Sequence, residues 1–463
     1  MYSRNIFDNI SPLDHRYSLP GEEFAEYAEF LSEKARIKYQ ARVEGALVKV
    51  LARRGICSQE VAREIQAAIE QITPEEVYEE ELKTRHDIRA LVNCIQRKVS
   101  PAARPYVHFT TTSFDIVDTA NSLRFREVSE KLLLPKLYEL EKLLMEIALR
   151  EKDTLQIGRT HGQHAVPITF GFAMAEYVSR LGNRIREVRE KSQKLVGKIA
   201  GAVGAYNASY LFFADPEEFE KEVLAELGLE PGPVSTQIVE PEPMTDFIHA
   251  LVSCFGVLAN LSDDMRHLQR SEIGEVGEYF AAEQVGSSTM PHKRNPINYE
   301  NVKSLWKKFM PGMVTVYMDQ ISEHQRDLTN SASARFLPEI AAGLLMAVQR
   351  LQRVLGRMQV DKENLRKNFD LSKEMIVAEP LYILLASHGH PDAHEAVRRL
   401  TLEAEQKGVP LRELLQEKEE LKAYWERFTE KQRDLLLNPE CYTGIAADKT
   451  VRVVEYWKEE LGI

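Results

Sequence analysis

Long stretches of the sequence place apolar side chains every three or four residues, the spacing that gathers them on one face of an α-helix. Residues 128–149 and 167–195 show this pattern over several turns. The expected buried positions are Leu133, Leu137, Leu140, Leu144 and Ile147 in the first stretch, and Ile168, Phe172, Leu181, Ile185 and Val188 in the second. Pro135 is expected to start or kink a helix. Because strand-like alternation is scarce and no βαβ rhythm appears, the sequence predicts an all-α protein, mostly or wholly helical.

The predicted helices differ in length along the chain. Those in the middle third run well past the ~11-residue average, and helices of that length usually pack side by side in a bundle. Shorter helices are broken by "RRGICSQE" and "QITPEE" near the start, and by "ASHGHPDAHE" and "EQKGVPLRE" near the end. We therefore predict a three-part fold: an N-terminal helical domain over 1–105, a long central bundle over 106–360 and a C-terminal helical domain over 361–463.

Charge and composition exclude several classes of partner. The net charge is −11, and Lys and Arg alternate with Asp and Glu instead of forming the concentrated basic face that nucleic acid requires. The first 18 residues carry charges where a signal peptide has its apolar core, and the stretch "FIHALVSCFGVLANLS" falls short of the ~20 residues of a membrane span. Four cysteines lie far apart, without a CxxC pair. We expect a cytoplasmic protein that binds neither nucleic acid nor membrane.

Two polar stretches in the first third precede predicted helices. In "TRHDIRA", Asp87 either caps a helix or belongs to a site together with Arg85 and His86. In "HFTTTSFDIVDTANSLRF", four consecutive hydroxyl residues precede the apolar face of the next helix. They either form an N-terminal cap or use the free N–H groups and dipole of the helix to hold a carboxylate or phosphate. Both interpretations stay open for each stretch.

A third stretch, "IGRTHGQHAVPITFG", places His161 in a loop bounded by Gly158 and Gly162, immediately before a predicted long helix. Glycines allow the backbone to approach another group closely. A histidine carries a proton near neutral pH, and Arg159 adds a charge beside it. We favour a catalytic role for His161 over a structural one.

The fourth stretch, "GSSTMPHKRNP" at residues 286–296, holds an unusual set of unlike groups. A serine removes a proton from carbon only as its alkoxide, which needs backbone N–H groups and a cation to stabilise it. Gly286 allows the backbone to present such N–H groups, and Lys293 supplies the positive charge. Lys293 and Asn295 are also suited to holding a carboxylate. The alternative is a flexible surface loop with a turn at Asn295.

One further cluster imitates a metal site. The stretch "SHGHPDAHE" contains His388, His390, Asp392 and His394. It lacks a fourth ligand at a familiar spacing, and Pro391 followed by Asp392 suits a helix start. We expect no metal and no cofactor.

The polar stretches together resemble a known superfamily. The segments "TTSFDIVDT", "GRTHGQHAVP" and "GSSTMPHKRNP" are similar, in order and separation, to the three signature regions of the fumarase and aspartase superfamily. The loop "PHKRNP" is also seen in carboxymuconate cycloisomerases. The elements "SPLDHRYS", "TRHDIRA", "AGAVGAYNA", "STQI" and "QRDLTNSASAR" resemble the adenylosuccinate lyase family. That resemblance implies β-elimination of fumarate from adenylosuccinate and from succinylated aminoimidazole carboxamide ribotide. It also implies a homotetramer with shared active sites.

The resemblance further implies roles for individual residues. Ser287 would be the base, and His161 the acid, tuned by Glu300; His86 has a rival claim to the acid role. The fumaryl carboxylates would be held by Lys293 and Asn295, helped by Thr112, Ser113 and Ser288. The substrate would be oriented by His86 and Asp87, and further contacts would come from Arg16, Tyr17, Arg85, Gln237 and Asn301. The nucleotide phosphate would be held by Arg326, Ser331 and Arg335.

Three other functions fit parts of the pattern. Another superfamily lyase, or a cycloisomerase acting on a small dicarboxylate, would need no phosphate site. A non-catalytic relative of the crystallin kind would not need the proposed acid, base and cation together. A helical scaffold for partner proteins leaves the co-occurrence of the polar stretches unexplained.

Overall fold

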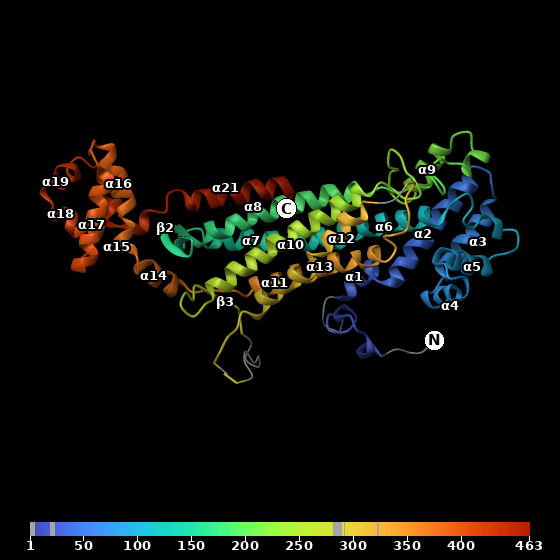
Figure 1. Ribbon diagram of the computed structural model, residues 1–463, viewed down its shortest axis with the longest axis horizontal. Helices are drawn as coiled ribbons and strands as arrows, with labels where there is room; N and C mark the ends of the chain where they lie inside the picture. The colour runs from blue at the N-terminus through green and yellow to red at the C-terminus, as the bar shows by residue number, and fades with distance from the viewer. Residues whose placement is uncertain (1–4, 19–23, 281–288, 291, 322–323) are drawn as a thin grey trace. The chain divides into compact units, whose positions relative to one another are not determined.

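Helices dominate the computed structural model, which describes residues 5–18, 24–280, 289–290, 292–321 and 324–463. These residues form 21 α-helices and four short strands (Figure 1). The prediction of a mostly helical protein is confirmed, whereas a wholly helical one is wrong, because residues 155–169 form a β-hairpin. The chain divides into two compact units: Met1–Glu139, Asn183–Ala259 and Val302–Arg350 form the first, and Leu140–Gly182, Asn260–Asn301 and Leu351–Ile463 the second. The three-part division stays a prediction.

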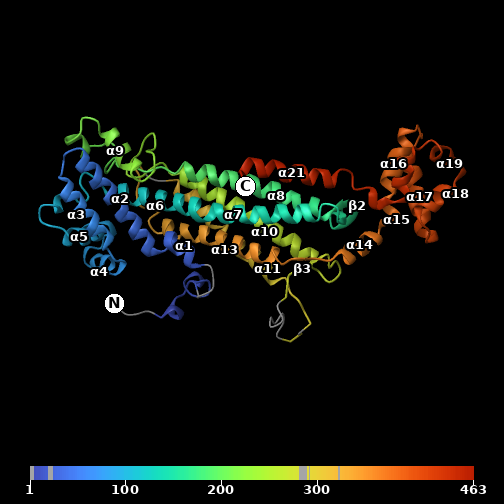
Figure 2. The ribbon, with the colours of Figure 1, turned by 180° about the vertical axis from the view of Figure 1, so that it is seen from behind.

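The first unit is built around α2 (Glu33–Arg53), which begins where the Ser32 hydroxyl accepts the Ala35 N–H at 3.2 Å. Contacts with α1, α3, α6 and α9 surround this helix (Figures 1 and 2). The other elements lying wholly in this unit are α1 (Phe24–Leu31), α3 (Gln59–Glu70), α4 (Pro74–Thr84), α5 (Asp87–Arg97), α6 (Ser113–Val128), α9 (Pro216–Ala225) and α12 (Gly312–Asp319). Short helical turns lie at Ile6–Asp8, Pro12–Asp14, Arg104–Tyr106, Ser129–Leu133, Ser209–Leu211 and Ser333–Phe336.

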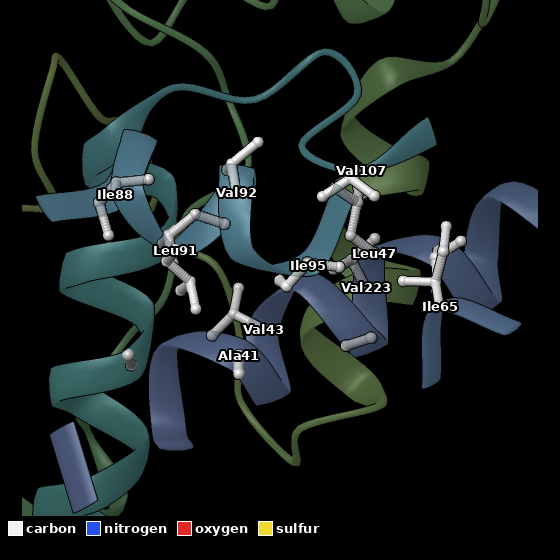
Figure 3. Packing of buried hydrophobic residues seen from close by; sticks show 14 of the residues in the cluster. Ala41, Val43, Leu47, Ile65, Ile88, Leu91, Val92, Ile95, Val107 and Val223 are labelled. Atoms are coloured by element: carbon white, nitrogen blue, oxygen red, sulfur yellow. The ribbon is translucent and has the colours of Figure 1, made fainter. Parts of the chain in front are cut away.

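The core of the first unit collects apolar side chains from helices that lie far apart in the sequence. Leu47 of α2, Ile65 of α3 and Leu91 of α5 belong to one cluster, are labelled in Figure 3 and are almost fully buried. Val223 of α9 belongs to the same cluster. This packing fixes the ends of α4, α5 and α6, which carry several of the predicted site residues.

Five long helices contain residues of both units. They are α7 (Leu134–Arg150), α8 (Phe170–Gln193), α10 (Glu242–Leu268), α11 (Ile297–Phe309) and α13 (Leu337–Leu355). Pro135 is the second residue of α7, after the π-helical turn Ser129–Leu133, so the prediction that it starts a helix is confirmed. The five predicted positions of residues 128–149 are all fully buried, which confirms the helical period of this stretch.

The prediction of buried positions in residues 167–195 is only partly right. Leu181, Ile185 and Val188 are fully buried on α8, but Phe172 is exposed. Ile168 lies on strand β2 (Gln163–Thr169), opposite Gln156 of β1 (Leu155–Thr160). The helix therefore begins at Phe170, because the preceding residues pair with β1 instead of continuing the helical pattern.

The second unit combines the hairpin with a set of C-terminal helices. Its elements are β1, β2, β3 (Val276–Gly277), β4 (Gln359–Val360), α14 (Lys362–Asp370), α15 (Lys373–Ile376), α16 (Ala378–Ser387), α17 (Ala393–Lys407), α18 (Leu411–Glu417), α19 (Glu419–Trp425), α20 (Glu430–Leu437), the turn Pro439–Cys441 and α21 (Ala446–Leu461). Helices α16 to α19 pack around Leu385, Leu400 and Leu411 (Figure 2). The predicted breaks before α17 and α18 are confirmed, as are those before α3 and α4.

Helix α10 is long and apolar enough to cross a membrane by length and composition, and it is the one such helix among the described residues. Its apolar side chains are nevertheless enclosed by protein: Phe247, Leu251, Leu258 and Leu261 have no exposed surface. A helix that is apolar on most sides and buried is typical of the core of a large protein. We interpret α10 as a core helix.

Candidate functional site

A cavity of about 650 Å³ lies in the first unit and collects many of the predicted residues. Its walls come from residues 11–14, α1, α2, the elbow between α4 and α5, α6, residue 237 and the segment 328–342. The volume suits a drug-sized or nucleotide-sized molecule. A hollow of about 700 Å³ on the second unit is lined only by α14 and its C-terminal end, and it contains none of the predicted residues.

The elbow between α4 and α5 presents His86 to this cavity. Arg85 ends α4 in the left-handed conformation, with φ +52°, and His86 caps α5. The His86 Nδ1 accepts the Arg89 N–H at 3.4 Å, so the expectation that Asp87 caps the helix is wrong; Asp87 is the first helical residue. Because Nδ1 accepts, the neutral ring carries its proton on Nε2, which lies 3.4 Å from the Ser113 hydroxyl. The ring thus presents a proton on the side that faces Ser113.

A network of charges lies beside His86. Arg36 on α2 binds Glu33 at 2.5 Å and Asp87 at 3.3 Å, and Arg335 lies 3.7 Å from the same Asp87 carboxylate. Burial alone would raise the pKa of Glu33, but the hydrogen bond and charge of Arg36 lower it. Burial likewise opposes the charge of Arg36, yet the bond to Glu33 raises its pKa above the ordinary value. Glu33 and Arg36 are therefore both held in their charged forms at this wall of the cavity.

Helix α6 begins at Ser113 with Thr112 as its cap, which confirms the predicted helix start. The Thr112 N–H is bound by the Asp115 carboxylate at 2.8 Å. Ser113 lines the cavity, whereas Thr112 does not. Asp115 itself is fully buried and paired with Lys198 at 2.5 Å, so it anchors the start of the helix. The alternative role of this helix end, as an anion site, stays a prediction.

Only some of the residues expected at the nucleotide line the cavity. Gln237, Ser331 and Arg335 line it. Arg326 does not, because its guanidinium donates to the carbonyls of Gln320, at 3.2 Å, and Asp319. Arg16 is exposed and Tyr17 is partly buried, and neither belongs to the cavity wall, which takes Ser11, Leu13 and Asp14 from that segment instead.

Sequence reasoning missed the polar face of α6. Asp118, Asn121 and Arg124 line the cavity together with Ser113. They recur every three residues on a helix that also buries apolar side chains such as Ile116 and Leu123, and that periodicity was the available signal. Arg36 on α2 was also missed, since an arginine on a helix usually lies at the surface.

The carboxyl of Asp118 is buried, which disfavours its charged form. Burial raises the pKa of its carboxyl to about 7, against the opposing effects of a hydrogen bond from the Val239 N–H and the charge of Lys198. The bond from Val239 is 3.0 Å long. It ties α6 to the segment that carries Gln237 into the cavity. Asp118 therefore positions this segment whether or not it is ionised.

The pKa of Asp118 makes stability depend on pH. The folded protein holds this proton up to about pH 7, while an unshifted carboxyl loses it near 3.8, so the folded state binds more protons between these values. Stability then falls as the pH rises through that interval. Asp118→Asn removes the ionisation that lowers stability, and its amide oxygen can still accept the Val239 N–H. We expect the variant to lose less thermal stability than the wild type between about pH 5 and about pH 8.

Melting temperatures at fixed protein concentration measure this difference. Asp448→Asn, at an exposed position on α21, is the matched control and should follow the wild type. If the melting temperatures of Asp118→Asn and the wild type changed in parallel with pH, the Asp118 carboxyl would have an ordinary pKa.

In the second unit, His161 lies at the tip of the β1–β2 hairpin. His161 and Gly162 both have positive φ, +56° and +73°, which is the geometry of a type I′ turn, and Thr160 pairs with Gln163 across it. The expectation that His161 directly precedes a long helix is therefore wrong. The turn exposes the imidazole to solvent.

Strand β1 of this hairpin is fixed by a buried acid, Glu275. Arg159 binds Glu275 through two hydrogen bonds, of 3.1 and 2.5 Å, and Gln156 donates to the same carboxylate at 2.8 Å. Asn368 of α14 adds a third donor at 2.9 Å. Arg159 thus holds the hairpin in place, while His161 stays free to meet another group.

The fourth polar stretch exposes most of its described side chains to solvent. Gly286, Ser287 and Ser288 lie outside the described residues. Lys293 and Glu300 are exposed, and Asn295 is partly buried. Asn301 on α11 has a buried side-chain oxygen without a hydrogen-bond donor.

The predicted pairing of His161 with Glu300 has no counterpart within the described part of one chain. Neither a hydrogen bond nor an ion pair joins the two side chains there. Both side chains are exposed to solvent. The pairing stays a prediction.

The histidine-rich stretch near the C-terminus forms the start of helix α17. The Asp392 carboxylate accepts the Glu395 N–H at 3.3 Å and caps α17, which confirms the predicted helix start. His390 accepts the Asp392 N–H at 3.1 Å. Within the described ranges, no three histidine, cysteine or acidic side chains are grouped as metal ligands would be.

Comparison with known proteins gives matches along nearly the whole chain. A family model described as "Lyase" matches residues 21–310, and one described as "Adenylosuccinate lyase C-terminal" matches residues 322–443. The adenylosuccinate lyase of Archaeoglobus fulgidus is 36% identical over 456 residues, which cover 98% of this chain and 99% of the relative.

Solved structures with the same fold include enzymes of different activity. The 3-carboxy-cis,cis-muconate lactonizing enzyme of Pseudomonas putida has a TM-score of 0.82 and 25% identity, covering 95% of this chain and 98% of its own. The fumarate lyase of Mesorhizobium sp. BNC1 has a TM-score of 0.82 and 25% identity, with 94% and 99% covered. The predicted superfamily fold is thereby confirmed.

Proposed function

Because the chain belongs to the adenylosuccinate lyase family of the fumarase superfamily, we propose that it releases fumarate from adenylosuccinate, giving AMP, in purine nucleotide biosynthesis. The same C–N bond cleavage acts on succinylated aminoimidazole carboxamide ribotide. The observation that carries this conclusion is the match to an adenylosuccinate lyase over 98% of the chain, with the family's C-terminal model included. The protein is a C–N lyase.

The cavity supports a nucleotide-sized substrate. It combines His86 and Ser113 with Ser331 and Arg335, which the resemblance assigns to the phosphate. A guanidinium is suited to phosphate because it offers paired N–H donors and a permanent charge. Arg326 belongs to the same predicted phosphate group, but its bonds to backbone carbonyls support a role in fixing the segment 319–326 instead.

The chemistry is a β-elimination. A base removes a proton from the carbon next to a carboxylate, the resulting carbanion delocalises into that carboxylate, and an acid protonates the departing nitrogen. We assign the base to Ser287 and the acid to His161, with Glu300 tuning the acid. Lys293, which is exposed, and Asn295 would hold the fumaryl carboxylates, helped by Ser288.

His86 is the alternative acid. Its Nε2–H faces Ser113 at the cavity, and its Nδ1 is fixed by the backbone of α5. A ring held in one tautomer is suited to donating a proton or a hydrogen bond in one direction. We assign it substrate orientation together with Asp87, since the resemblance gives the acid role to His161.

A homotetramer with shared active sites is part of the proposal. The exposed His161 and Glu300 do not meet within the described part of one chain, which favours partners from other subunits. Val314, Tyr317 and Met318 form an exposed apolar face on α12, the kind of surface that oligomers cover. Free thiols at all four cysteines support a cytoplasmic location.

The absorbance change on mixing purified protein with adenylosuccinate tests the function. Formation of AMP and fumarate is the expected result. Absence of both products at any reasonable enzyme concentration would overturn the proposal. Turnover of a carboxymuconate in place of adenylosuccinate would favour the cycloisomerase, whose fold this chain shares.

Arg335→Gln tests the phosphate site. A charge-assisted hydrogen bond contributes about 1.5–3 kcal/mol, so the loss of this guanidinium should raise KM by about 10- to 100-fold. Steady-state kinetics with adenylosuccinate measure the change. Arg452→Gln, at an exposed position of α21, is the control and should keep its KM. An unchanged KM for Arg335→Gln in an active enzyme would remove Arg335 from the substrate site.

A further inference from the structure

Arg124 is a buried cation without a partner. It lies on α6 with 4% of its surface exposed, and it lines the cavity. In the described part of the chain it forms neither a hydrogen bond nor an ion pair, and its buried Nε has no acceptor. Proteins rarely bury an unpaired charge, because desolvation is costly unless another group compensates it. An unpaired guanidinium at the wall of a cavity points to a ligand that supplies the missing anion.

The surroundings of Arg124 increase the need for an anion. Burial, together with the nearby charge of Arg36, lowers the pKa of Arg124 to about 10, while Glu33 and Tyr39 act in the opposite direction. At that value the guanidinium is still charged at neutral pH. The Phe125 ring lies 5.4 Å from it and offers only a weak interaction.

The charged groups beside Arg36 pair with one another and leave Arg124 without an ion-pair partner. Arg36 and Arg335 share the two carboxylates of Glu33 and Asp87, and these four charges cancel. Arg124 forms an ion pair with neither carboxylate.

Two further carboxyls of the cavity, Asp118 and Glu339, are shifted toward their neutral forms. Burial raises the pKa of Asp118 to about 7. Burial also raises the pKa of Glu339, against the opposing charge of Lys308. Asp118 therefore carries only part of its negative charge near neutral pH. The guanidinium of Arg124, which has no acceptor for its buried Nε, stays available to an incoming oxyanion.

We propose that Arg124 binds an oxyanion of the nucleotide substrate, its phosphate or one of its carboxylates, at a subsite of the cavity next to Arg36. This assignment rests on the proposed function. Arg124 offers a planar set of N–H donors that match either group in a bidentate arrangement. The bound anion completes the hydrogen bonds that the protein itself leaves unmade.

Arg124→Met tests the subsite, since methionine replaces much of the volume without the charge. If Arg124 serves only the ligand, the ligand-free variant should melt at the same or a higher temperature, because a buried unpaired charge has been removed. Its KM for adenylosuccinate should rise at least about tenfold. A structural role for Arg124 would instead lower the melting temperature and leave KM unchanged, which would overturn the proposal.

Arg124→Lys is the second variant. It keeps the charge but loses the bidentate geometry, so its KM should lie between those of the wild type and Arg124→Met. Arg126→Met is the matched control. Arg126 lies on the same helix, outside the cavity wall, and pairs with Glu130 at 2.9 Å. It should keep the wild-type KM. Equal KM values for all three variants and the wild type would contradict the inference.

Ligand-induced shifts of the melting temperature identify the anion and need no turnover. The probes are AMP, adenosine and fumarate. If Arg124 binds phosphate, Arg124→Met should lose the shift caused by AMP, while the fumarate shift remains. If it binds a carboxylate, the fumarate shift should disappear instead. Full retention of both shifts would overturn the subsite. A wild type that binds these anions but does not cleave adenylosuccinate would overturn the proposed function alone.

Discussion

Replacing Lys198 with methionine should lower the free energy of unfolding by about 3–5 kcal/mol, the cost of breaking a buried ion pair by removing one partner. The Lys198 Nζ lies 2.5 Å from the Asp115 carboxylate, and the two side chains are 1% and 0% exposed. The ammonium also donates to the Gly201 carbonyl at 3.0 Å. Without it, the Asp115 carboxylate stays buried with only backbone N–H groups around it.

The effect should reach the cavity as well. Asp115 accepts the N–H groups of Thr112, Ala200 and Gly201, at 2.8, 3.1 and 3.2 Å, so it joins the start of α6 to the segment after α8. Ser113 lies at that helix start and lines the cavity. We therefore expect the variant to lose substrate affinity along with stability.

Urea unfolding at fixed protein concentration measures the change in stability. Lys194→Met is the matched control, because Lys194 is exposed on the same segment and should change stability by less than about 0.5 kcal/mol. A loss of less than about 1 kcal/mol for Lys198→Met would mean that Asp115 takes up a proton or a water at low cost.

Ser287→Ala should lower kcat by about 10²–10⁴-fold, the contribution of a positioned general base, while the substrate still binds. Ser287 lies outside the described residues, and its role comes from the resemblance of "GSSTMPHKRNP" to the third signature region of the superfamily. Alanine removes the hydroxyl that would take the proton but leaves Lys293 and Asn295, which would hold the fumaryl carboxylates. The ground-state affinity should therefore change little.

Single-turnover kinetics with adenylosuccinate separate binding from chemistry. Ser288→Ala is the control, since its hydroxyl is assigned to holding a carboxylate and its loss should affect KM more than kcat. Turnover of Ser287→Ala within about tenfold of the wild type would place the base elsewhere. His86, whose ring faces the cavity, would then be the next residue to replace.

Local features of the fold were predictable because they depend on neighbours in the chain. The buried positions from Leu133 to Ile147 follow the helical period. The caps at Thr112 and Asp392 are satisfied within three residues. The hairpin at 155–169 was missed, since its strands are short and its tip depends on positive φ at His161, which sequence pattern does not signal.

The chain by itself determined the helical fold class and, through its polar stretches, the family and the elimination chemistry. These properties reside in short contiguous segments whose residues act together. Only the tertiary structure decided which charges meet at the cavity. Arg36, Asp87, Arg124 and Arg335 come from four separate helices or turns, and packing of α2, α5 and α6 brings the first three to one wall. The unpaired state of Arg124 depends on what surrounds it in space, so no local pattern in the sequence could have revealed it.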